Sequence, residues 1–313
     1  MPSPTLLAVP NVSEGREEET IDAVGRAFAG EAGGVRVLDV HSDADHHRSV
    51  YTLAGRQGEL ADALLRGAAV AVERIDVIGD RPDRDAPGGQ HPYVGALDVA
   101  PVVYLDASAR GAACAEALLV ADRIGSELEL PVFVYGELAG DRPCSTRAEL
   151  RRGGVAGLAR RMAAGDGAIG GRRPDFGLGR MHATAGATLI AARPPLVAFN
   201  VQLSAPATVQ DARRIAALIR DGGAEGLPGV RAIGVQLGGG VAQVSMNVER
   251  PLDIPLALVV EAVCRHAVLA GAELVGLAPR AALEGFPQDV PLPGFDAARH
   301  VIENAVGENS LGS

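Results

Sequence analysis

With 313 residues, the chain exceeds the roughly 250 to 300 residues at which one hydrophobic core usually stops growing, so we expect two domains. Its net charge of −10 argues against a sequence-independent nucleic-acid binder, because such a protein needs basic residues to neutralise phosphates. All 29 basic residues are arginine, which excludes chemistry that depends on a lysine amine, such as a pyridoxal Schiff base or a Walker-type phosphate loop.

The first half of the chain alternates short apolar runs with helical patterns. Ile21, Val24 and Phe28, for example, recur at the spacing of one helix face. We expect strands at 6–9, 35–40, 49–53, 99–105 and 131–135, and helices at 16–29, 60–68 and 112–129. Thr146, followed three residues later by Glu149, predicts a capping box at the start of a further helix.

A segment rich in glycine and arginine, residues 153–180, separates the two halves. It lacks a sustained apolar period, which favours a domain boundary or a substrate-lining loop. We therefore expect an N-terminal subdomain over 1–180, a C-terminal subdomain over 181–290 and a tail over 291–313.

The second half repeats the mixture of strands and helices. We expect strands at 188–192 and 196–203 joined by a Pro-Pro turn, a helix from Thr208, a hairpin over 232–248 around Gly238–Gly240, a helix at 255–270 and a strand at 273–277. Each half then has about two helices on a small sheet. The predicted fold class is α/β (α+β) with two sandwich subdomains, although no residue-level repeat is visible.

The compartment is indicated by the cysteines and by the apolar runs. Cys114, Cys144 and Cys264 are odd in number and far apart, which is typical of a reducing setting. No signal-peptide pattern is visible, and the most apolar region, 186–203, is interrupted by Arg193-Pro194-Pro195. We expect a cytoplasmic protein that binds small molecules and neither membranes nor nucleic acid.

His91 is the residue best suited to proton transfer. It follows a loop rich in Gly, Pro and Asp and precedes a predicted strand, where a rigid scaffold can present an imidazole to a cleft. Histidine side chains exchange protons near neutral pH. An ordinary loop histidine has the same pattern, and spacing alone does not distinguish the two.

Six possible metal ligands lie close together: Asp39, His41, Asp43, Asp45, His46 and His47. Imidazole and carboxylate groups suit zinc or a similar divalent ion. No complete metal-binding motif is present, however, and neighbouring side chains on a loop rarely all face one ion. We therefore expect no metal here but a solvated loop, in which Arg48 pairs with one of the carboxylates.

Arginine is concentrated between Arg147 and Arg180. Eight arginines stand there against three acids, a local surplus of five positive charges that fits either an anionic substrate or a solvated surface. Asn200 and Asn247 lie within strand-like runs, where asparagine is disfavoured. Their positions indicate either edge strands or polar groups turned toward a ligand.

Short segments, in a fixed order along the chain, carry a family pattern. They are 9–16 (Val-Pro-Asn-Val-Ser-Glu-Gly-Arg), 38–50, 91–101, 134–137, 174–177, 186–188, 198–203, 232–234, 243–247 and 274–277. Together they resemble the formimidoyltransferase domain that also occurs fused to a cyclodeaminase. The resemblance extends over residues 6–283, and its strength lies in the collinearity of the segments.

The resemblance implies two βαββαβ-like subdomains with a folate-binding crevice between them, usually in a homodimer. It also implies transfer of a formimidoyl group from N-formimidoylglutamate to N5 of tetrahydrofolate, in histidine catabolism, with a related formyl transfer as a side activity. Tetrahydrofolate is then the co-substrate, and no metal is expected. His91 takes the family's catalytic position, and residues 177–186 match a segment lining the folate site. The expected substrate- or folate-binding residues are Asn11, Arg48, Tyr93, Asp175, Gly177, Leu178, Gly179, Arg180, Met181, His182, Ala183, Thr184, Ala185, Gly186, Asn200 and Asn247.

Three positions depart from the usual family residues. Tyr93 stands where arginine is usual, His41 where aspartate is common, and Ala185 where an aromatic residue is common. These changes affect the recognition of carboxylate and pterin groups. Two further hypotheses therefore stay open, namely the same transfer with a different amine partner and a non-catalytic folate-binding module. If His41 approaches His91, it would tune that histidine by lowering its pKa.

Overall fold

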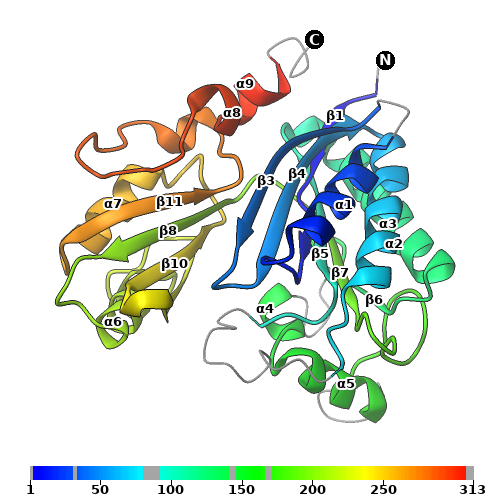
Figure 1. Ribbon diagram of the computed structural model, residues 1–313. Helices are drawn as coiled ribbons and strands as arrows, with labels where there is room; N and C mark the ends of the chain where they lie inside the picture. Colours follow the sequence, from blue (N-terminus) through cyan, green and yellow to red (C-terminus); the bar gives the residue numbers. More distant parts are fainter. Residues whose placement is uncertain (1–2, 31–33, 80–91, 141–145, 166–170, 308–313) are drawn as a thin grey trace. The chain divides into compact units, whose positions relative to one another are not determined.

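The computed structural model describes residues 3–30, 34–79, 92–140, 146–165 and 171–307. The chain forms two compact units, Met1–Pro194 and Pro195–Ser313 (Figure 1). This division lies later than the boundary expected after residue 180, because the strand at 188–193 pairs within the first sheet. Each unit is a mixed α/β structure with its own sheet and its own hydrophobic core, as the sequence predicts.

The first unit begins with a βαββαβ arrangement. Its elements are β1 (Thr5–Ala8), β2 (Asn11–Val12), α1 (Glu18–Ala29), β3 (Arg36–Asp43), β4 (Arg48–Arg56), α2 (Glu59–Arg74) and β5 (Leu97–Tyr104). β1 and β2 share one place in the sheet, since each pairs antiparallel with both β4 and β5. β3 pairs with β4, so the strand order here is β3, β4, β1/β2, β5.

A parallel extension completes the first sheet. It comprises the 3₁₀ turn η1 (Ala107–Ala109), α3 (Arg110–Glu127), β6 (Val132–Gly136), α4 (Arg147–Leu150), α5 (Gly154–Ala164) and β7 (Thr188–Arg193). β7 lies between β5 and β6 and runs parallel to both. The capping box of Thr146 and Glu149 is confirmed. The sequence analysis did not predict the helix α5. This helix is short and contains glycine, which lowers its helix propensity, and its few apolar residues are recognised as one buried face only in the folded structure.

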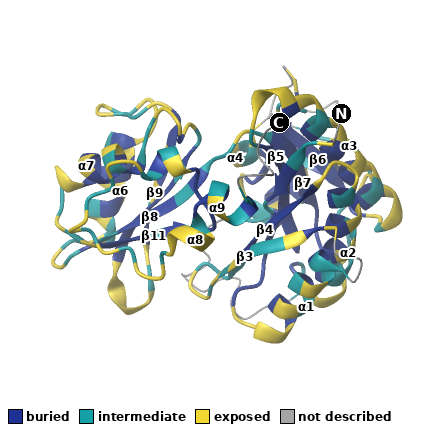
Figure 2. Ribbon diagram, turned by 90° about the horizontal axis from the view of Figure 1, so that it is seen from above, coloured by how far each residue is buried: buried dark blue, intermediate teal, exposed yellow. Residues whose placement is uncertain are grey.

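Two cores lie on opposite faces of the first sheet. On one face α1, α2 and α3 pack against the strands, with Phe28 and Leu64 fully buried. On the other face Leu150 of α4 and Leu158 of α5 pack against β5, β6 and β7. Within the described residues, this second core includes none from β3 or β4. Figure 2 shows that β4, β5 and β7 are largely buried, whereas β3 is mostly intermediate or exposed.

The second unit has the same order of elements, with every strand pair antiparallel. It comprises β8 (Val197–Leu203), α6 (Val209–Ile219), β9 (Val230–Gln236), η2 (Gly238–Gly240), β10 (Ala242–Val248), α7 (Leu256–Cys264) and β11 (Leu269–Val275). The strand order β11, β8, β10, β9 corresponds to β5, β1/β2, β4, β3 of the first unit. The predicted hairpin of β9 and β10 is confirmed, as is the helix that begins at Thr208.

The second half differs from the expectations in detail. β7 and β8 are joined through Pro194 and Pro195, as expected, but they belong to different sheets and do not pair with each other. α7 ends at Cys264, since residues 269–275 pair with β8 and this pairing overrides the helical period. The tail carries structure after η3 (Arg280–Leu283), with α8 (Ala297–His300), α9 (Ile302–Val306) and a buried Ile302. Within the described ranges, no helix is long and apolar enough to cross a membrane.

Candidate functional site

The predicted site residues of the first unit lie near the starts of β4, β5 and β7. Val12 of β2 pairs with Ser49 on one side and with Leu97 on the other. The first residues of β4 and β5 are therefore at the same level of the sheet. β7 runs parallel to β5, so its start lies at the same end.

The loop ahead of β5 is hydrogen-bonded to the loop ahead of β7. The amide of Ala96 donates to the carbonyl of Ala185 at 2.9 Å, and the amide of Ala187 donates to the carbonyl of Val94 at 2.9 Å. His91 itself lies outside the described residues, as does Cys144. The segment that follows His91 in the sequence is thus joined to the segment expected to line the folate site.

Glycine is required where these two loops meet. A Cβ at Gly95 would collide with the carbonyl of Ala187. Gly186 has a φ of +72°, and a Cβ there would collide with the carbonyl of Val94. Both glycines therefore permit an approach between the loops that no other residue would allow.

The segment expected to bind folate is held at both of its ends. At the start, the amide of Asp175 donates to Val132 at 2.8 Å, and Asp175 Oδ2 accepts the amide of Val134 at 2.9 Å. At the end, His182 Nδ1 accepts the amide of Ala185 at 3.1 Å. The backbone of this segment is therefore fixed by its own side chains and by β6.

Between these anchors the segment is largely open to solvent. The exposed residues are Gly177, Gly179, Arg180, Ala183 and Thr184, whereas Leu178, Met181 and His182 are half-buried and Ala185 and Gly186 are buried. The exposed positions are free to contact a ligand, and the buried ones hold the turn.

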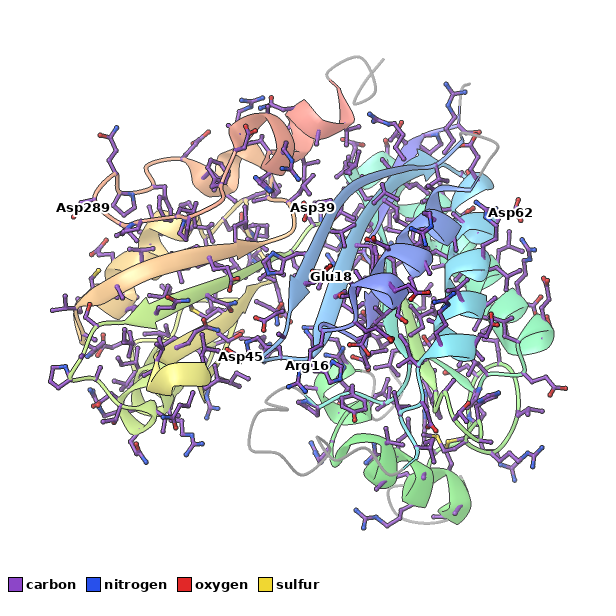
Figure 3. The ribbon with its side chains drawn as sticks, in the orientation of Figure 1. Arg16, Glu18, Asp39, Asp45, Asp62 and Asp289 are labelled. Atoms are coloured by element: carbon purple, nitrogen blue, oxygen red, sulfur yellow. The ribbon has the colours of Figure 1, made fainter. Side chains whose placement is uncertain are left out.

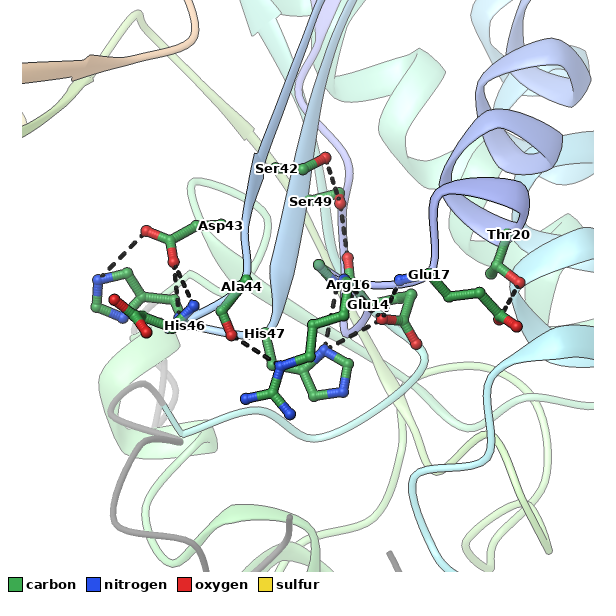
Figure 4. Close-up of polar contacts among 12 residues, drawn as sticks. Glu14, Arg16, Glu17, Thr20, Ser42, Asp43, Ala44, His46, His47 and Ser49 are labelled. Carbon is green, nitrogen blue, oxygen red and sulfur yellow. Dashed lines mark hydrogen bonds and ion pairs between the residues drawn. The ribbon is translucent and has the colours of Figure 1, made fainter. Parts of the chain in front are cut away.

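A turn around Glu14 organises the start of α1. Glu14 is 5% exposed, and its Oε1 accepts the amides of Gly15, Arg16 and Glu17 at 3.0, 2.9 and 3.2 Å. His47 Nδ1 lies 3.3 Å from the same oxygen and accepts the amide of Gly15 at 3.1 Å (Figure 4). The carboxylate thus satisfies three backbone amides of the turn that precedes α1, and His47 ties this turn to the one before β4.

The acidic and histidine-rich stretch is a strand followed by a tight turn, and not the predicted loop. Asp39, His41 and Asp43 lie on β3, and Asp45 and His46 in the turn after it (Figure 3). Asp43 Oδ1 accepts the amides of Asp45 and His46, each at 2.8 Å. Among the described residues no group of three or more His, Cys, Asp or Glu could hold a metal ion.

Asn11, His41 and Arg48 lie on one face of the sheet, opposite α1, α2 and α3. Cross-strand partners share a face. His41 and Asn11 both lie opposite Val50, and Asp43 lies opposite Arg48. The structure therefore brings together three predicted site residues from three strands, although the Asn11 side chain also donates to the nearby carbonyl of Val9 at 3.0 Å.

Arg48 has an unusual charge environment. No described side chain forms a hydrogen bond or ion pair with it, so the predicted pairing with a carboxylate of the 39–47 stretch is wrong. Burial, and next the nearby Arg151, lowers the pKa of Arg48 to about 9, while Asp98 acts in the opposite direction. At neutral pH this guanidinium is charged and lacks a direct partner among the described side chains.

Asp98 and Arg151 form a buried ion pair that sequence reasoning missed. They are 1% and 7% exposed, and Arg151 donates to Asp98 Oδ2. Asp98 Oδ1 accepts the amide of Val94 at 2.9 Å, which fixes the backbone beside Tyr93. A lone acid in the apolar run 97–104 is a usable sequence signal for Asp98. Arg151 has no such signal, because its burial depends on how α4 packs.

The arginine surplus does not form one continuous anion site. Arg161 donates to the carbonyls of Arg152 and Leu150 at 2.7 and 2.6 Å, and Arg172 pairs with Asp175 at 3.2 Å. Arg161 thus joins α5 to the end of α4, whereas Arg172 stabilises the segment after α5. Of the eight, Arg147 and Arg151 are the ones that act electrostatically on Arg48.

In the second unit, polar side chains line the sheet face opposite α6 and α7. Alternation along the strands puts Phe199 and Val201 in the core and Asn200 on the other face. Asn200 lies opposite Ser245 of β10 and Glu273 of β11, and it donates to Glu273 at 2.8 Å. β8 and β10 are interior strands, so the edge-strand interpretation of Asn200 and Asn247 is wrong. The face that carries these polar groups also includes Gln202, Gln243 and Asn247.

Comparisons with known proteins give the same division of the chain. The formiminotransferase domain, N-terminal subdomain, matches residues 5–193, and the formiminotransferase domain matches residues 198–286. Glutamate formimidoyltransferase of Streptococcus pyogenes serotype M1 is 35% identical over 303 residues, covering 95% of this chain and 96% of that protein. Glutamate formimidoyltransferase of Thermoplasma acidophilum is 33% identical, covering 92% and 93%.

Longer relatives contain a further part. Formimidoyltransferase-cyclodeaminase of Sus scrofa is 36% identical over 297 residues, which is 90% of this chain and 51% of that protein. The chain thus spans nearly the whole of the shorter relatives and about half of the longer one. With matches over both of its units, the chain belongs to the formiminotransferase family of transferase enzymes.

Proposed function

We propose that this protein transfers the formimidoyl group of N-formimidoylglutamate to N5 of tetrahydrofolate. The observation that carries this proposal is the hydrogen-bonded junction between the segment after His91 and residues 185–187. The family resemblance assigns the first segment to catalysis and the second to folate. The names of the Streptococcus pyogenes and Thermoplasma acidophilum relatives support the same reaction.

His91 is the acid–base group in this proposal. N5 of tetrahydrofolate attacks the amidine carbon, which forms a carbon–nitrogen bond and a tetrahedral intermediate. Collapse breaks the bond to the glutamate nitrogen, after one proton leaves the attacking nitrogen and another reaches the departing nitrogen. One imidazole can perform both transfers, so no second catalytic residue is needed.

Tetrahydrofolate is a co-substrate in this scheme, and residues 177–186 are its expected contacts, whereas Asn11, Asn200 and Asn247 are expected to contact either substrate. His41 lies on the same sheet face as Arg48, and its role as a tuning partner of His91 remains a prediction. We also propose a cytoplasmic location, as the cysteine pattern indicates, and a homodimer, as the resemblance implies. Sedimentation equilibrium would test the dimer.

The test is turnover of the purified protein with tetrahydrofolate and N-formimidoylglutamate, followed by absorbance of the formimidoyl-folate product. Tyr93, where the family usually has arginine, favours a second candidate in which the donor is a formimidoyl derivative of another amine. A donor panel that varies the amine distinguishes the two. Folate binding without turnover of any donor would instead identify a non-catalytic binding module.

A further inference from the structure

We propose that Arg48 and Arg151 form a carboxylate-binding subsite at the start of β4. The ligand is a carboxylate of one of the two substrates, either on the amino-acid donor or on the glutamate tail of folate. This inference rests on the proposed function and adds a binding element to it. Three features support it. The backbone of Arg48 is held rigidly, the nearby acids are hydrogen-bonded to other groups, and Arg151 has a nitrogen donor without a hydrogen-bond partner in the described part of the chain.

The backbone of Arg48 is held in place by the Glu14 turn. A Cβ at Gly15 would collide with the carbonyl of Asp43 and come within 2.5 Å of the amide nitrogen of Arg48. Ser49, the next residue, donates to the carbonyl of Glu14 at 2.6 Å (Figure 4). Arg48 therefore starts from a fixed point, which reduces the entropy lost when its side chain binds a ligand.

The two acids near Arg48 are already engaged with other groups. Asp98 accepts from Arg151 through one oxygen and from the amide of Val94 through the other. Asp43 Oδ1 accepts two amides of its own turn, and Oδ2 lies 3.8 Å from His46 Nε2. Neither acid forms an ion pair with Arg48 among the described contacts, so the positive charge of Arg48 is not neutralised directly.

Arg151 supplies the second guanidinium. Asp98 fixes its orientation, yet Arg151 Nε is buried and has no hydrogen-bond partner within the described part of the chain. A buried donor without a partner costs free energy, and a bound acceptor would remove that cost. Arg48 and Arg151 together carry two positive charges, and Asp98 neutralises one of them. The remaining charge and the guanidinium donors suit a ligand carboxylate, which is negative and accepts through two oxygens.

The depressed pKa of Arg48, about 9, agrees with such a subsite. Burial and the neighbouring Arg151 disfavour the charged form in the empty protein. A bound carboxylate would offset both effects. The charge is thus poorly accommodated by the fold itself, which is the pattern expected for a binding residue and not for a structural one.

The decisive variant is Arg48→Gln, with Arg56→Gln as the matched control. Arg56 ends the same strand, is exposed and lies outside the site. We expect Arg48→Gln to raise one substrate's KM by about 10- to 100-fold with little change in kcat, because a charged hydrogen bond to the ligand is lost. Arg48→Lys, which keeps the charge but not the guanidinium, should raise this KM less than Arg48→Gln does. Arg56→Gln should behave as wild type.

The carboxylate can come from the donor or from the glutamate tail of folate, and the substrate whose KM rises in Arg48→Gln identifies its source. A higher KM for N-formimidoylglutamate assigns the subsite to the donor. A higher KM for tetrahydrofolate, together with loss of discrimination against tetrahydropteroate, which lacks the glutamate, assigns it to the folate tail. Unchanged KM values for both substrates would overturn the proposal.

Thermal unfolding with glutarate and with folate keeps the test independent of turnover. We expect one of these carboxylates to raise the melting temperature of wild type and of Arg56→Gln but not of Arg48→Gln. Without ligand, Arg48→Gln should melt at or above the wild-type temperature. Equal ligand protection in Arg48→Gln, or a lower melting temperature without ligand, would refute the subsite. If wild type does not turn over at all, the proposed function fails, and this measurement still decides the subsite.

Discussion

The two units share a βαββαβ order and a strand order, but they differ in the groups on the sheet face opposite their crossover helices. In the first unit that face carries Asp39, His41, Asp43 and Arg48. In the second, β8 and β10 carry amides and a hydroxyl, Glu273 of β11 accepts from Asn200, and Arg231 of β9, the cross-strand partner of Asn247, pairs with Glu249. The difference is clearest on the second strand of each hairpin, because β4 carries Arg48 on this face whereas β10 carries the uncharged Gln243, Ser245 and Asn247.

One residue type recurs on the equivalent strand of both units. Asn11 lies on the strand between β4 and β5, and Asn200 lies on the strand between β10 and β11. An asparagine thus occupies the equivalent strand twice, although the surrounding residues differ. We propose that the first unit supplies charge and, through His91, proton transfer, whereas the second contributes mainly uncharged hydrogen-bonding groups. The predictions below test that separation.

The largest effect should come from the first unit. Replacing His91 by Ala should lower kcat by about 100- to 10,000-fold, because the acid–base group is removed. His266→Ala in the second unit is the control, since the hydrogen bond of the His266 ring within the described part of the chain is to Glu225, at 3.0 Å, and not to a predicted site residue. Steady-state kinetics at saturating substrates would measure both variants. Full activity of His91→Ala would remove this residue from the mechanism.

The ionic character of the first unit should also appear in stability. Asp98→Asn leaves Arg151 buried without a counter-charge and should lower the free energy of unfolding by about 3–5 kcal/mol. Glu273→Gln in the second unit keeps an acceptor for Asn200 and should cost about 1 kcal/mol or less. Urea denaturation measures both changes. Equal losses would contradict the distinction between the units.

A third test uses pH. The pKa of Arg48, about 9, lies below that of an ordinary arginine, so its positive charge is lost as pH rises through this value. The kcat/KM of the substrate bound by Arg48 should fall about tenfold for each pH unit above it. Arg48→Gln should lack this decline. If the variant shows the same decline, another group is responsible.

The smallest effect should come from the neutral face. Asn200→Ala removes one hydrogen-bonding amide and should raise the KM for tetrahydrofolate by about 2- to 10-fold at constant kcat. Asn11→Ala, the equivalent change in the first unit, should show a similar rise. A large loss of kcat in Asn200→Ala would mean that the second unit contributes to chemistry and not only to recognition.

Local patterns predicted much of the fold correctly. The apolar periods located α1, α2 and α3, the turn glycines located the β9–β10 hairpin, and Thr146 with Glu149 marked the start of α4. Each of these signals depends on residues close in sequence. The failures, at α5, at the end of α7 and in the partners of β7 and β8, all depend on strand pairing or packing between distant segments.

The sequence alone determined the family, the mixed α/β class with two subdomains, and the choice of His91 as the candidate acid–base residue, because collinear motifs and periodicity are local properties. The tertiary structure decided that Arg48 stands without a direct partner among the described side chains while Asp98 holds Arg151. It also decided that Asn11 and Asn200 occupy equivalent strands. These facts arise from register and burial within each unit, which bring together residues far apart in the chain, such as Asn11 with Val50 or Asp98 with Arg151, and therefore leave no local trace in the sequence.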